Sequence, residues 1–148
     1  MKNIIGFSAL FCSIIALSAL VAHLLALPAK MRLSAQDYLT VQGIYRGWAW
    51  LGVFELAAIV LTLVWTIREY HHSGNFAFLF TAGSCLIVSI AIFFLFTFPA
   101  NSATHNWIKL PLNWLDLRKQ WEYSHAIRAL LNLASVSLLL VMLLKNSD

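Results

Sequence analysis

The sequence predicts an all-α fold, an integral membrane four-helix bundle with two longer loops at one end. Three observations predict this fold. Hydrophobic residues make up 61% of the chain and charged residues only 11%, whereas a soluble domain carries about 25% charged residues. The apolar residues gather in four segments, each near the roughly 20 residues that a membrane-spanning helix needs. Lipid offers no hydrogen-bond partners, so such segments satisfy their backbone groups by forming helices.

The bounds of these helices follow from capping and breaking residues. Pro28 and Pro99 are expected to end the first and third helices, because proline cannot continue the hydrogen-bond ladder. Ser34 and Asp37 resemble a helix start, so the second helix is expected to begin directly after Ser34 and to project beyond the bilayer. The first apolar segment is longer than the core of a signal peptide and is interpreted as a membrane helix. The expected single domain, residues 1–148, has helices at about 4–27, 35–69, 76–98 and 121–144.

The connections between the helices differ in length. The turn at 69–75 is short, whereas the connections at 28–43 and 99–120 are long and lie at the same end of the bundle. Most lysines and arginines belong to this long-loop end. The positive-inside rule therefore places the long loops in the cytoplasm.

Charge and cysteine usage argue against two classes of function. The net charge is +4, but the basic residues form no run or stripe, so nucleic-acid binding is not expected. Cys12 and Cys85 lie inside apolar segments and the chain has no C-x-x-C motif. A membrane thiol–disulfide oxidoreductase needs a close and accessible pair, so this class is not expected either.

The last helix carries a stripe of polar and aromatic residues within an arc of about 100°. Ionisable groups at membrane depth are costly, so the stripe is expected to face the inside of the bundle. One interpretation is interhelical hydrogen bonding, with the outermost arginine reaching the interface. The other interpretation is a binding or reaction site. The stripe consists of Arg118, Trp121, His125, Arg128, Asn132 and Ser135.

The first helix offers a face of small residues that includes His23 near the long-loop end. We expect His23 to face His125, either as a hydrogen-bonded structural group or as a catalytic or ligand-binding residue. Two inward histidines raise the alternative of a haem or metal site. Carboxylates are scarce nearby, however, and no H-x-x-x-H spacing occurs. The sequence therefore predicts no cofactor, with haem or metal at His23 and His125 as a minor alternative.

The second helix contributes Tyr45, Arg46 and a carboxylate deep in the membrane, Glu55. Glu55 is expected at the depth of Arg128 or Asn132, where it forms a structural ion pair or handles protons. In a continuous helix, Glu55 lies nearly opposite Arg46, so the two are not expected to share one tight site. After the third helix comes a polar and aromatic loop, whose side chains either hold a ligand or anchor the loop.

Several short patterns carry a family resemblance. They are Pro99-Ala100-Asn101, Asn106-Trp107 and Arg118-x-x-Trp121-x-x-x-His125-x-x-Arg128, with the stretch from Ala22-His23 to Gln42-x-x-Tyr45-Arg46-Gly47. In these patterns the chain resembles the bacterial branch of the anthrone oxygenase-like family of small four-helix membrane proteins. The resemblance covers most of the chain and implies a multi-pass protein of the bacterial inner membrane.

For some fungal members of that family, the resemblance implies oxygenation of an anthrone to an anthraquinone without a bound cofactor. His125 would then take a proton from the substrate, and Arg128 and Arg118 would stabilise the resulting anion. Trp121 and Trp107 would stack on the aromatic ring. The expected catalytic residues are His125, Arg128 and His23, and the expected substrate-binding residues are Tyr45, Arg46, Asn101, Asn106, Trp107, Arg118, Trp121 and Asn132.

Three hypotheses for the function remain open. The first is a membrane oxidoreductase acting on a lipophilic aromatic or quinone-type molecule, with a cavity near the long loops. The second is a non-enzymatic scaffold or accessory subunit, in which the polar groups pair with one another and leave no cavity. The third is a small transporter or lipid-binding protein, which needs a path to the other face. Each places the chain in contact with membrane lipid, and homo-oligomers are compatible with all three.

Overall fold

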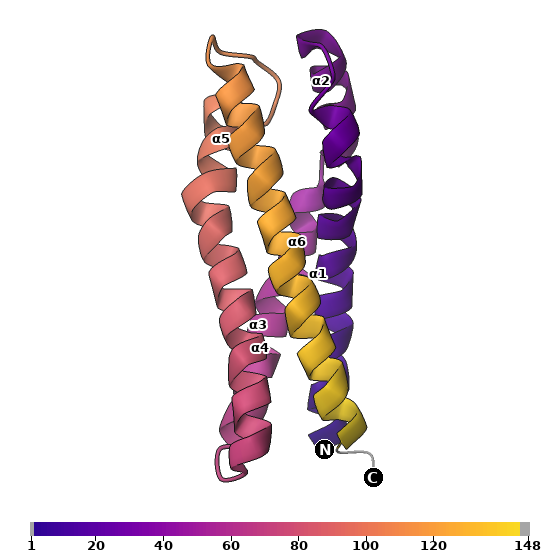
Figure 1. Ribbon diagram of the computed structural model, residues 1–148, viewed down its shortest axis with the longest axis vertical. Coiled ribbons are helices and arrows are strands. Elements are labelled where there is room, and N and C mark those ends of the chain that lie inside the picture. The colour runs from indigo at the N-terminus through magenta and orange to yellow at the C-terminus, as the bar shows by residue number, and fades with distance from the viewer. Residues whose placement is uncertain (1, 146–148) are drawn as a thin grey trace.

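A computed structural model describes residues 2–145, apart from the side chains of residues 2, 3 and 73, as four long helices packed side by side (Figure 1). Four stretches are long and apolar enough to cross a membrane, so the chain is a multi-pass integral membrane protein. They are Ile4–Lys30, Trp48–Arg68, Gly74–Ala103 and Trp114–Lys145. The predicted all-α four-helix bundle is therefore confirmed.

The helical elements follow one another along the whole described chain. They are α1 (Lys2–Lys30), α2 (Ala35–Gln42), the 3₁₀ turns η1 (Gly43–Tyr45) and η2 (Trp48–Leu51), α3 (Gly52–Arg68), α4 (Ser73–Ile92), the π-helical η3 (Phe93–Thr97), α5 (Phe98–Ala103) and α6 (Trp114–Lys145). In Figure 1, α6 crosses in front of α3, with α1 on one side and α4 on the other. The two long connections lie together at the end opposite the chain termini.

The expected continuous helix at 35–69 is wrong. Three glycines, Gly43, Gly47 and Gly52, fall within ten residues of it, and glycine weakens a helix interior. Gly47 adopts a left-handed conformation with φ of 86°, where the chain changes direction between η1 and η2. The start of this region was predicted correctly, because Ser34 caps α2 by accepting a hydrogen bond from the Asp37 backbone at 3.2 Å.

The two prolines do not end their helices. Pro28 lies inside the last turn of α1, which continues to Lys30, so the missing N–H costs only one hydrogen bond near a terminus. Pro99 lies in the first turn of α5, which follows the π turn η3 without interruption. A π turn changes the hydrogen-bond register, and here it does so just before the residue that lacks a donor.

The last helix begins at Trp114, seven residues before the expected position 121. Its first two turns are polar, so a search for apolar segments does not include them.

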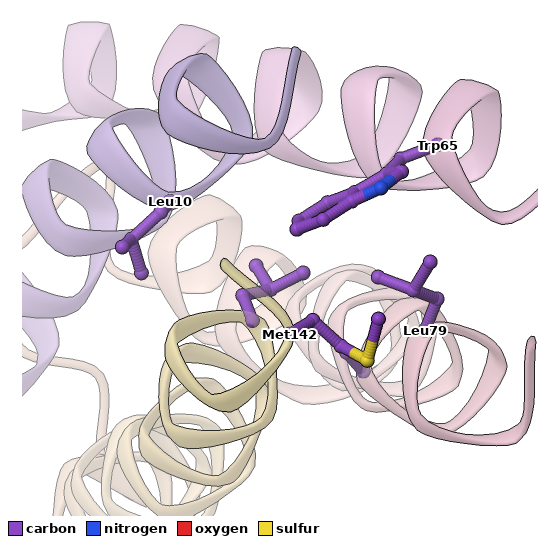
Figure 2. Packing of buried hydrophobic residues seen from close by; sticks show 6 residues of the cluster. Leu10, Trp65, Leu79 and Met142 are labelled. Carbon is purple, nitrogen blue, oxygen red and sulfur yellow. The ribbon is translucent and has the colours of Figure 1, made fainter. Parts of the chain in front are cut away.

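The termini end of the bundle is held by apolar packing. Leu10, Trp65, Leu79 and Met142 meet there from α1, α3, α4 and α6 (Figure 2). Gly6 allows the close approach of α1 to α3, because a Cβ atom at this position would lie 2.8 Å from the Trp65 ring. This half therefore acts as a close-packed base for the polar half above it.

Candidate functional site

Two histidines meet in the long-loop half of the bundle. The rings of His23 on α1 and His125 on α6 stack with centroids 4.3 Å apart and an interplanar angle of 22°. Tyr45 lies 4.3 Å from the His23 ring, and Trp121 lies 4.3 Å from the His125 ring. The Trp48 ring also contacts His23, with ring centroids 5.7 Å apart. The Nδ1 atom of His125 is buried and has no hydrogen-bond partner among the described residues.

An enclosed ion pair lies on the loop side of the histidines. Lys30 Nζ is 2.7 Å from a carboxylate oxygen of Glu122, and both side chains are almost fully buried. The Tyr38 hydroxyl donates to the other oxygen of Glu122 at 2.9 Å. Lys30 Nζ also lies 3.4 Å from His23 Nδ1, so it connects the carboxylate to the histidine pair. Paired in this way, both charges are compensated inside the bundle.

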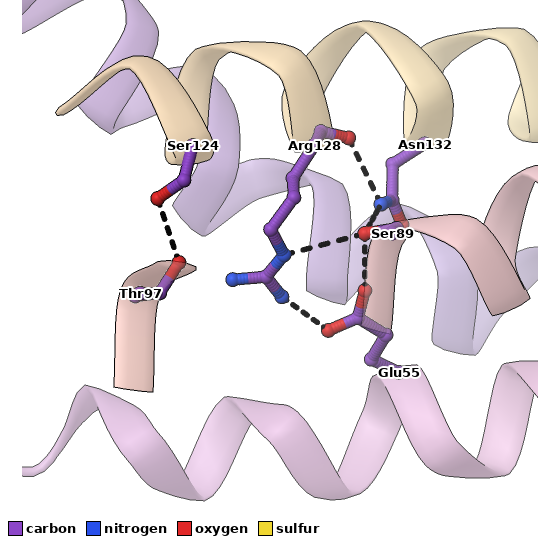
Figure 3. Close-up of polar contacts among 6 residues, drawn as sticks. All are labelled: Glu55, Ser89, Thr97, Ser124, Arg128 and Asn132. Carbon is purple, nitrogen blue, oxygen red and sulfur yellow. Dashed lines mark hydrogen bonds and ion pairs between the residues drawn. The ribbon is translucent and has the colours of Figure 1, made fainter. Parts of the chain in front are cut away.

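A second ion pair lies deeper in the membrane (Figure 3). Arg128 donates from Nη2 to Glu55 at 2.6 Å and from Nε to the Ser89 hydroxyl at 3.3 Å. Ser89 in turn donates to Glu55 at 2.7 Å and accepts from Asn132 at 2.8 Å. Of the alternatives left open for Glu55, the structure shows the ion pair, and its partner is Arg128. The hydrogen bonds of the Arg128 side chain within residues 2–145 come from Nε and Nη2, and Nη1 donates none among these residues.

A cavity of about 620 Å³ borders both histidines and this deeper ion pair. It reaches from Arg46 and Asn106, which are exposed at the long-loop end, down to Ala16 and Glu55 inside the membrane spans. The wall is mostly apolar, and its volume lies in the range of small-molecule sites. Of the residues expected at the site, it is lined by His23, Tyr45, Arg46, Asn101, Asn106, Trp107, Trp121, His125 and Arg128.

Arg46 and Glu55 border the same cavity, although they were expected on opposite sides of one helix. That expectation assumed an unbroken helix, and the break at Gly47 removes the angular relation. Two other expected binding residues do not line the cavity. Arg118 donates to the Leu33 carbonyl at 3.0 Å, and Asn132 is held by Ser89.

The loop after α5 borders the cavity and has an unusual backbone conformation. His105, Asn106 and Trp107 all have positive φ, between 50° and 60°, at a cost of roughly 1–2 kcal/mol per residue. The Asn106 backbone donates to the Asn101 carbonyl at 2.7 Å, and the Trp107 backbone donates to the Thr104 hydroxyl at 3.1 Å. These bonds hold a conformation that the sequence alone does not favour.

This conformation buries the Trp107 ring over the aromatic residues of the site. Its centroid lies 5.0 Å from that of Tyr38 and 6.0 Å from that of Trp121. The Trp121 indole donates to the Asn101 side chain at 2.7 Å, which fixes the orientation of a ring in the cavity wall. Asn101 therefore positions Trp121 and also borders the cavity.

Tyr38 and Tyr45 keep neutral hydroxyl groups at this end of the bundle. Burial raises the pKa of Tyr38, and the negative charge of Glu122 raises this pKa further. Burial also raises the pKa of Tyr45, with a smaller contribution from Glu122. Tyr45 therefore presents a neutral hydroxyl to the cavity, able to donate or accept a hydrogen bond.

Sequence reasoning missed Lys30, Glu122, Tyr38 and Trp48 as part of the site. Glu122 lies about 40° outside the stripe on α6, and Lys30 follows the proline that was expected to end α1. The available signal was spacing, because Lys30 comes seven residues after His23 and shares its helix face once α1 continues past Pro28.

The geometry does not fit a shared haem or metal on the histidines. Ring nitrogens present their lone pairs in the ring plane, whereas His23 and His125 turn their faces toward each other. No group of three or more histidine, cysteine, aspartate or glutamate side chains that could hold a metal ion occurs among the described residues.

Comparisons of the chain with models of protein families, with curated proteins and with solved structures give no match.

Proposed function

We propose that the protein is a membrane oxidoreductase related to the anthrone oxygenase-like proteins, which acts on a lipophilic aromatic or quinone-type molecule in the cavity beside His125. One observation carries the proposal. His125 lines an apolar cavity bordered by aromatic rings, and its buried Nδ1 atom has no hydrogen-bond partner among the described residues. Aromatic walls suit a planar ligand, and an unpartnered imidazole nitrogen suits proton transfer.

The proposed reaction begins with the removal of a proton from an acidic C–H or O–H bond of the substrate by His125. The resulting anion lies near Arg128, which retains one unoccupied N–H edge for an oxyanion. Dioxygen is the oxidant for an anthrone substrate: one oxygen atom forms the new carbonyl group, and the other leaves as water with the two hydrogens of the oxidised carbon. His23 and Trp121 contact the His125 ring and fix its orientation.

The cavity favours this proposal over a self-paired scaffold. A scaffold predicts that the polar groups satisfy one another and leave no space, which describes Lys30 and Glu122 but not His125. A transporter needs a polar path to the opposite face, yet Leu10, Trp65 and Met142 belong to an apolar cluster at the termini end.

Turnover of the purified protein tests the proposal. In lipid nanodiscs, dioxygen consumption and product formation are measured with a panel of anthrones and alkylated quinols. His125→Gln should lower turnover by about 10²- to 10⁴-fold. His71→Gln, an exposed histidine at the termini end, should leave turnover unchanged. Absence of turnover of every compound by the native protein, or equal turnover by His125→Gln, would contradict the proposal.

We also propose that the long loops face the cytoplasm of a bacterial inner membrane. Leu112 is fully exposed in the loop before α6. A membrane-impermeant thiol reagent should label Leu112→Cys only after cells are opened. Labelling of intact cells would reverse the orientation.

A further inference from the structure

The cavity is bordered on one side by residues that are also exposed. Val53 and Leu56 on α3 and Phe94 in η3 line it. These three residues are also 56%, 54% and 59% exposed. All three belong to membrane-spanning stretches. Residues that border the cavity and also face outward at this depth place a lateral opening toward lipid.

The irregular helix segments on both sides form this opening. On one side, the turn η2 leads into α3, and a Cβ atom built on Gly52 would meet no atom within 4 Å. On the other side, the π-helical η3 replaces a regular turn. A second cavity of about 580 Å³ adjoins the first here and shares Ala49, Phe94 and Asn101 with it. The wall is therefore interrupted where η2 and η3 border the two cavities.

The chemistry of the wall changes from the opening inward. The outer rim is apolar, and the inner wall carries the polar side chains of His125 and Arg128. A hydroxyl or carbonyl group suits the inner wall, and a hydrocarbon chain suits the rim. This order matches an amphiphile whose polar ring lies inside while its chain extends into the bilayer.

We propose that the ligand reaches the cavity from the bilayer between α3 and η3, and that it is a hydroxy- or oxo-aromatic ring carrying an apolar chain. This inference rests on the proposed function for the identity of the ring. The chain passes between Leu56 and Phe94 while the oxygen of the ring meets Arg128. The opening at the long-loop end, beside Arg46 and Asn106, serves water and small polar species.

Two quinones with the same ring test this route, one with a ten-carbon alkyl chain and one with none. Their association with the protein in nanodiscs is followed by quenching of the cavity tryptophans in stopped flow. The variant Val53→Phe/Leu56→Phe narrows the opening with apolar side chains that lipid tolerates. Its control is Val60→Phe/Leu63→Phe, two turns further along α3, where the same side chains face outward away from the cavity.

The narrowed variant should bind the chain-bearing quinone at least about tenfold more slowly, equivalent to a barrier about 1.4 kcal/mol higher. The chain-free quinone should bind at an unchanged rate, which also shows that the variant is folded. The control variant should match the native protein with both compounds.

Each other outcome has a separate meaning. Unchanged binding of the chain-bearing quinone, or equal slowing of both compounds, would overturn the lateral route while the proposed function stands. If neither quinone binds the native protein, the quinone-type ligand of the proposed function fails, and the route inferred from it fails too.

Discussion

The two buried ion pairs of this bundle have the same charges but different surroundings. Along α6, His125 lies midway between Glu122 and Arg128, and each of these pairs with an opposite charge from another helix. Lys30 and Glu122 do not line the cavity, whereas Glu55 and Arg128 both do. One pair is therefore enclosed by protein, and the other is open to a ligand.

Aromatic rings and a tyrosine hydroxyl contact the enclosed pair. Lys30 Nζ lies 5.0 Å from the ring centroids of both Tyr45 and Trp121, and Glu122 also accepts from Tyr38. The open pair leaves one edge of Arg128 unused. Because a buried ion pair contributes little net stability over apolar packing, the difference indicates that the first pair fixes the geometry and the second is available for binding.

The largest expected effect is the removal of one charge from the enclosed pair. Lys30→Met leaves the Glu122 carboxylate buried without its cation, so we expect unfolding to become easier by about 3–5 kcal/mol. Equilibrium unfolding in mixed micelles measures this loss. The double variant Lys30→Met/Glu122→Gln removes both charges and should recover most of it. A loss below about 1 kcal/mol for the single variant would show that the pair is not enclosed.

A smaller loss of stability is expected at the open pair. Glu55→Gln keeps a hydrogen-bond acceptor for Arg128, and the adjoining cavity admits water. We therefore expect the free energy of unfolding to fall by about 1–2 kcal/mol. The variant also leaves the Arg128 charge uncompensated beside the cavity. An ionised alkylphenol should therefore bind about tenfold more tightly, while its neutral methyl ether should not, as measured by tryptophan quenching. Equal affinities of the variant and the native protein for the phenolate would show that Arg128 does not face the ligand.

The sequence predicts the last helix of the site better than the connections. All six residues of the stripe on α6 are buried, because regular 3.6-residue periodicity continues without a break from Arg118 to Ser135. The pairing of Glu55 with Arg128 could also be inferred from the sequence, because two opposite charges at one membrane depth are expected to form an ion pair.

The parts that escaped prediction depend on backbone irregularity. Whether a helix stops at Pro28 or Pro99 depends on how nearby turns compensate for one lost donor, which packing decides. The left-handed run ending at Trp107 is stabilised by backbone contacts across the loop, not by its own residue types. Lys30 and Trp107 therefore reach the site through segments whose path local propensity does not determine.

The last expected effect depends on pH and concerns the hydroxyl that completes the enclosed pair. Tyr38→Phe removes the hydrogen bond to Glu122. The free energy of unfolding should therefore fall by about 1–2 kcal/mol at neutral pH. Burial raises the pKa of Tyr38 in the folded state above its ordinary value near 10. The folded protein therefore keeps this proton above pH 10 while the unfolded chain releases it. The contribution of the hydroxyl to stability is complete below pH 10 and is lost as the pH rises, by about 1.4 kcal/mol per pH unit. Unfolding measured from pH 8 to 11 should show the native protein losing its advantage over Tyr38→Phe near pH 11, whereas a constant difference across this range would mean that Tyr38 is not enclosed with Glu122.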